Sequence, residues 1–98
     1  MEMFQKDSEE VVNVVSDYFN LDSERVLSKE MTSLVVKARR IIIYILHKDY
    51  GYNSSLIAKL FNGGKRRVFV ACELIREFMK IYEDYRTDYN EVTRLLNK

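Results

Sequence analysis

Apolar residues recur every three to four positions along most of this chain, which is the spacing of helices covered on one side. The longest such series lies at about residues 31–48 and predicts a central helix through Met31, Leu34, Val35, Ala38, Ile41, Ile42, Ile45 and Leu46. Val36 and Ile43 lie off this series, so we expect the helix to be covered on more than one side. The side chains expected to face away are Lys37, Arg40, Tyr44, His47 and Lys48.

The same spacing predicts shorter helices on the N-terminal side. One opens at Ser8 and ends near Asn20, and a short helix follows with Asp22 as its N-cap. Gly51 lies in the turn after the central helix, where a positive φ is expected.

Between about residues 53 and 85 the pattern predicts two helices joined by Asn62-Gly63-Gly64. Asn53 or Ser54 caps the first, and the second runs from Gly64 to about Tyr85. The core stripe of the second helix is Val68, Ala71, Cys72, Ile75, Phe78, Met79 and Tyr82. Its opposite face holds Arg66, Phe69, Val70, Glu73, Arg76, Glu77 and Lys80.

A last helix is expected to begin with Thr87 or Asp88 as its cap, with Glu91 in a capping box. All of these patterns are helical. The fold class that they predict is an all-α, compact bundle of about five to six helices, which we expect to form a single domain over residues 1–98.

The second helix of the pair starts with three cations, Lys65, Arg66 and Arg67. Positive charge at a helix N-terminus opposes the helix dipole unless an anion docks there. A helix, a glycine turn and a helix with a basic start are typical of a helix-turn-helix that binds DNA. Lys59 points outward from the first helix. Phe69 lies on the outer face of the second, where it would meet thymine methyl groups or pack in a protein contact.

The charges are unevenly distributed along the chain. Residues 1–34 carry eight acids and three bases, residues 35–67 one acid and eight bases, and residues 68–98 six acids and five bases. The middle third therefore carries a net charge of +7, which predicts either a surface for a polyanion or a solvated face neutralised by the acidic N-terminal third.

Composition argues against several other classes of protein. One cysteine and one histidine exclude an internal disulfide, a multi-cysteine zinc site and most triads. We find no nucleophile paired with a base, no phosphate-binding glycine loop, no implied cofactor and no sign of a small-molecule substrate, so we do not expect an enzyme. The N-terminus lacks the pattern of a signal peptide and no apolar run is long enough to cross a membrane, so we expect a cytoplasmic protein.

Several segments together are similar to a known family. Residues 15–29, 36–41, 55–61 and 71–75 resemble the C-terminal DNA-binding domain of the bacterial replication initiator DnaA, and the resemblance covers about residues 11–97. It implies an all-α fold of the Trp-repressor class that contacts double-stranded DNA. By the same resemblance, Arg39 falls where an arginine enters the minor groove, with Lys37 and Arg40 beside the DNA backbone. Asn53, Ser54 and Ser55 fall near a helix cap that touches phosphate.

The sequence departs from that family at one place. The family reads bases with an Arg-Asp-His-Ser/Thr-Thr run after its glycine pair, whereas this chain has Lys65, Arg66 and Arg67. The leading hypothesis is a small stand-alone double-stranded DNA-binding protein with a replication, regulatory or mobile-element role. The alternative is a protein-interaction or oligomerisation module on the same fold, with a homodimer as one form. The initial Met and the capped last helix favour a complete chain over a fragment.

Overall fold

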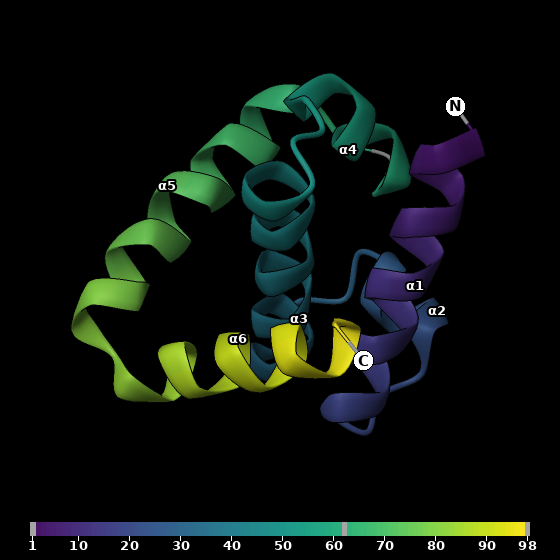
Figure 1. Ribbon diagram of the computed structural model, residues 1–98. Coiled ribbons are helices and arrows are strands. Elements are labelled where there is room, and N and C mark those ends of the chain that lie inside the picture. The colour runs from purple at the N-terminus through teal and green to yellow at the C-terminus, as the bar shows by residue number, and fades with distance from the viewer. Residues whose placement is uncertain (1, 62, 98) are drawn as a thin grey trace.

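The central helix of the sequence pattern is α3 (Ser33–Tyr44), around which the other helices pack (Figure 1). The structure is a computed structural model that describes residues 2–61 and 63–97, so Asn62 of the predicted turn lies outside the described residues. In chain order the other elements are α1 (Glu2–Tyr18), α2 (Ser23–Leu27), the π-helical turn η1 (Ile45–Asp49), α4 (Ser54–Leu60), α5 (Lys65–Ile81) and α6 (Glu83–Leu96). These elements are all helical across the described ranges, which confirms the all-α prediction.

The core is built on α3 and η1. Most of the predicted apolar series is fully buried there: Val35, Ala38, Ile41, Ile42, Ile45 and Leu46. Ile43 is buried as well, so the helix is covered on more than one side, as expected. Tyr44 was expected to face away, and this is wrong, because its ring packs edge-on against Tyr89 of α6 at 5.4 Å.

The N-terminal end of the predicted central helix is also wrong. Met31 and Leu34 are 75% and 44% exposed instead of buried. The helix begins only at Ser33, so Met31 belongs to the loop that precedes it, and Leu34 lies in a first turn where Ser33 is exposed as well. The apolar spacing therefore predicts a helix start two residues before the observed one at Ser33.

The turn after α3 adopts a wider helical geometry before the chain reverses. In η1 the Tyr50 amide donates to the Ile45 carbonyl at 3.2 Å, the hydrogen-bond spacing of a π-helix. Gly51 then takes a φ of +78°, which confirms the predicted positive φ and which a side chain would strain.

Helix α1 begins at Glu2, six residues before the predicted start at Ser8. Phe4 is buried and packs edge-on against Tyr52 at 4.9 Å, so a tertiary contact holds the extra turns. Ser8 does not cap the helix. Its hydroxyl donates to the Gln5 carbonyl within the helix at 3.1 Å.

The predicted boundary between the last two helices is likewise wrong. Helix α5 ends at Ile81, Tyr82 is extended, and α6 starts at Glu83 rather than after Thr87 or Asp88. The Arg86 guanidinium donates to the carbonyls of Met79 and Lys80, which satisfies acceptors left open at the end of α5.

Neither member of the predicted capping box plays that role. Asp88 binds residues of other helices, and Glu91 pairs with Arg94 at 2.8 Å. In the part of the chain that the structure describes, the helices are too short or too polar to cross a membrane.

Candidate nucleic-acid interface

Helices α4 and α5 form the predicted helix-turn-helix, and the cations lie at its turn. Lys65, Arg66 and Arg67 make up the first turn of α5 and are exposed. The N-cap, Gly64, offers the helix no side-chain hydrogen bond, so the helix N-terminus stays open to an external anion. Within residues 2–61 and 63–97, no carboxylate lies within 4.0 Å of the ammonium or guanidinium nitrogens of these three cations.

The two faces of α5 divide as the pattern predicted, except that Tyr82 of the predicted core stripe is 47% exposed because α5 ends before it. Val68, Cys72 and Ile75 are buried against the rest of the fold, whereas Phe69 is 59% exposed on the opposite face. The acids of that outer face are already paired along the helix. Glu73 lies 3.3 Å from Arg76, and Glu77 lies 3.7 Å from Lys80. Their repulsion of a polyanion is therefore reduced, and they lie beyond the first turn.

Helix α4 presents its polar start on the surface. The Asn53 side-chain oxygen accepts the Leu56 amide at 2.9 Å, which confirms Asn53 as the N-cap. Ser54 is half-buried, while Ser55 and Lys59 are exposed. Lys59 lies in the last turn of α4, and α4 packs against α5 as the other helix of this unit (Figure 1).

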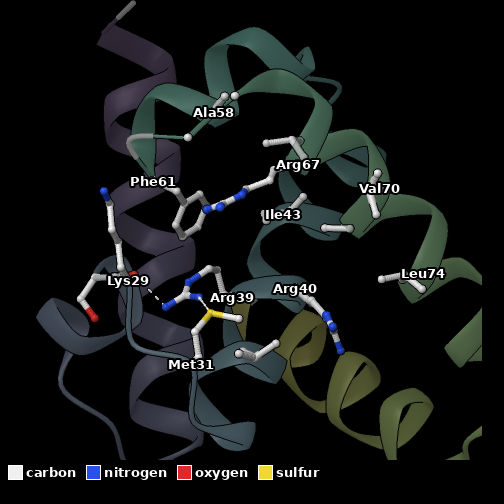
Figure 2. Close-up of a pocket in the computed structure, with 16 residues that line it drawn as sticks. Lys29, Met31, Arg39, Arg40, Ile43, Ala58, Phe61, Arg67, Val70 and Leu74 are labelled. Atoms are coloured by element: carbon white, nitrogen blue, oxygen red, sulfur yellow. Dashed lines mark hydrogen bonds between the residues drawn. The ribbon is translucent and has the colours of Figure 1, made fainter.

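A hollow of about 310 Å³ lies beside this unit, between α3, α5 and the loop before α3. Figure 2 shows Arg39 and Arg67 reaching into it from α3 and α5. Lys29 and Arg40 also line the hollow, so four cations surround it and none of its described lining residues is acidic. Lys29 was not among the predicted site residues, because only the folded loop brings it close to α5.

Arg39 holds that loop in place. Its guanidinium donates to three backbone carbonyls, those of Val26 at 3.0 Å, Ser28 at 2.8 Å and Glu30 at 2.9 Å. Burial lowers the pKa of Arg39, and the nearby charge of Arg67 adds to this lowering, although Glu30 opposes it. The side chain expected in the minor groove is thus committed to the protein's own backbone.

The loop that Arg39 holds is also closed by an ion pair. Glu30 accepts from Arg25 and from the Thr32 hydroxyl. These two hydrogen bonds lower the pKa of the Glu30 carboxyl to about 2. The carboxylate of Glu30 is therefore held at Arg25 of α2.

Lys37 lies away from the other candidates, because α6 binds it. Its ammonium lies 2.8 Å from Asp84 and 2.5 Å from Asp88 and is over the Tyr85 ring. Burial opposes the charge of Lys37, but the hydrogen bonds to the two carboxylates outweigh it and raise its pKa. Arg40 lines the hollow, but its guanidinium lies 5.5 Å from the ring centroid of Phe78, which is not among the lining residues (Figure 2).

The comparison with known proteins agrees with this geometry. A family model described as the bacterial dnaA protein helix-turn-helix matches residues 8–75, which include α1 from Ser8 onward, α2 to α4 and most of α5. The chain belongs to the bacterial DnaA helix-turn-helix family. Helix α6, which supplies the partners of Lys37, lies beyond the matched residues.

Two curated relatives are each named chromosomal replication initiator protein DnaA. The one from Bacteroides fragilis (strain YCH46) is 28% identical over 92 residues, and the one from Bacteroides thetaiotaomicron is 26% identical over 92 residues. Each alignment covers 92% of this chain but only 19% of the relative, so the chain spans about a fifth of their length.

Proposed function

We propose that this DnaA-family chain binds double-stranded DNA with the start of α5 in the major groove. The observation that carries the proposal is the first turn of α5. Three exposed cations there have no carboxylate partner within the described chain, and the helix dipole adds to their positive potential. The names of the relatives add support for a role near replication initiation, which we propose for this chain as well.

The contacts would be mostly to the DNA backbone. Lys65, Arg66 and Arg67 each neutralise a phosphate or grip a guanine, and Lys59, Ser55 and Ser54 approach a phosphate from α4. Asn53 has its oxygen engaged as the cap and offers only its amide donors. Phe69 reaches thymine methyl groups, and Arg40 stands at the edge of this surface.

Two of the candidate residues are not counted among these contacts. Lys37 is bound by two carboxylates, and the Arg39 guanidinium is bound by three carbonyls. An interface with few base-reading side chains predicts weak sequence preference, which fits a chain that has cations in place of the family's base-reading run.

The test is the salt dependence of duplex binding, measured by fluorescence anisotropy. For the K65A/R66A/R67A triple variant we expect the negative slope of log affinity against log salt to become shallower by about 2.7, because each lost phosphate contact removes about 0.9. At about 0.1 M salt the affinity should fall by roughly 10²–10³-fold for every duplex.

The matched control removes three cations outside the proposed interface, in a K6A/K48A/R94A variant. It has the same net charge as the test variant, so an effect of overall charge would appear in both. Equal losses of affinity in the two variants, or no binding of any duplex by the natural chain at about 50 mM salt, would refute the proposal.

A further inference from the structure

We infer that the hollow between α3 and α5 is a docking groove for an acidic, amphipathic helix of a partner protein. This surface adjoins the proposed DNA interface and shares Arg67 and Arg40 with it, but the inference does not depend on that function. It rests on the shape of the hollow, on its apolar walls and on the sign of the charges around it (Figure 2).

The two helical walls have matching lengths. On α3 the wall runs from Val36 to Ile43, and on α5 it runs from Arg67 to Leu74. Each wall covers eight residues, and its first and last residues are about 10.5 Å apart along the helix axis. That is also the span of side chains at positions i, i+3 or i+4, and i+7 of a helix lying in a groove. The volume of about 310 Å³ leaves room for apolar anchors of this kind.

The walls are apolar and incompletely covered. Phe61 and Ala71 are half-buried, while Val70 and Leu74 on α5 are 46% and 37% exposed. Across the hollow, Met31 is 75% exposed on the loop that Arg39 holds. Exposed apolar side chains that gather around one concave surface are typical of a protein-binding site.

The charged residues that line the hollow determine which kind of partner is favoured. Lys29, Arg39, Arg40 and Arg67 line the hollow, and none of the lining residues that the structure describes is acidic. An anionic partner is therefore favoured. A DNA duplex would satisfy the cations but would bring a charged, convex backbone to an apolar hollow. A helix with an apolar stripe and acidic flanks satisfies both features, so it is the occupant that we propose.

The test uses a designed peptide as the probe. A helical peptide of about 18 residues, long enough to form a helix alone, carries Leu at heptad-spaced positions and Glu elsewhere. Binding is followed by fluorescence anisotropy, and its place by amide chemical shifts of the labelled chain. We expect shifts at Val70, Ala71 and Leu74, and at least about tenfold weaker binding of a scrambled peptide of the same composition.

Variants on opposite walls test whether the peptide binds in the groove or on the surface around it. Leu74→Asp and Met31→Asp should each weaken peptide binding by about tenfold, because each places a carboxylate beside an acidic ligand. The matched control is Ile81→Asp, which changes a 64% exposed residue of α5 that does not line the hollow and should change the affinity less than about twofold.

The outcomes are distinguishable from those of the DNA test. Equal binding of the designed and scrambled peptides, or shifts confined to residues outside the hollow, would overturn the inference. So would a loss of duplex binding in Leu74→Asp and Met31→Asp without a loss of peptide binding, since the hollow would then belong to the DNA interface. The amide chemical shifts of the natural chain locate the bound peptide without any variant. They therefore test the inference even if a substitution unfolds the protein.

Discussion

Cations from the same basic third of the chain differ in whether the fold pairs them with carboxylates. Lys37 lies between Asp84 and Asp88 of α6, whereas Lys65, Arg66 and Arg67 meet no carboxylate among the described residues. In sequence each of these four cations contributes equally to the net charge of +7 over residues 35–67. Of these four cations, only Lys65, Arg66 and Arg67 are available to a polyanion. The surface that attracts a polyanion therefore depends on which cations are paired with carboxylates, and not on the number of cations in the sequence.

The Lys37 site is a structural cluster that joins three helices. The Tyr18 hydroxyl of α1 donates to Asp88 at 2.8 Å, and Asp88 in turn binds Lys37 of α3. The Lys37 ammonium also lies 5.9 Å from the Phe19 ring centroid. The hydrogen bond from Lys37 lowers the pKa of Asp84. This cluster is expected to contribute to stability, and the start of α5 to binding.

The largest effect on this comparison is expected from Lys37→Met. The variant leaves the half-buried Asp88 without its cation, which should lower the free energy of unfolding by about 2–3 kcal/mol. The duplex affinity should change less than about twofold, because Lys37 is not a phosphate contact. Urea unfolding and anisotropy measure the two quantities. Lys6→Met is the control with the same charge change, and a loss of DNA affinity without a loss of stability would reverse the assignment.

A smaller effect is expected from Arg39→Lys, which keeps the charge but loses the planar fork that reaches three carbonyls. Stability should fall by about 1–2 kcal/mol, and amide exchange in the loop at residues 28–32 should become faster. The ratio of affinities for A·T-rich and G·C-rich duplexes should stay the same. A reduced ratio with unchanged stability would instead place Arg39 in the minor groove.

The smallest effect concerns the alkaline behaviour of the cluster. Burial and the hydrogen bond to Asp88 raise the pKa of Tyr18 to about 12, so its neutral form is favoured in the fold. This contribution to stability is complete below pH 10 and is lost as the pH rises from 10 through 12. Urea unfolding across this window should show a shallower decline for Tyr18→Phe than for the natural chain. Parallel declines would exclude Tyr18 as the titrating group.

The sequence predicted the elements whose signals are local. The 3.6-residue period identified the core of α3, Asn53 was confirmed as a cap, and Gly51 was confirmed at a positive φ. The start of α5 at Lys65 followed from the glycine turn before it. These features depend on neighbouring residues, so a linear pattern contains the information that they need.

By itself, then, the sequence determined the helices, the family and the basic turn of the helix-turn-helix. The tertiary structure decided which cations are free, because the partners of Lys37 lie 47 and 51 residues away on α6. It also decided the early start of α1, the break at Tyr82 and the hollow beside Arg67. Such pairings depend on how helices pack in three dimensions, and the sequence next to each residue does not identify its partner.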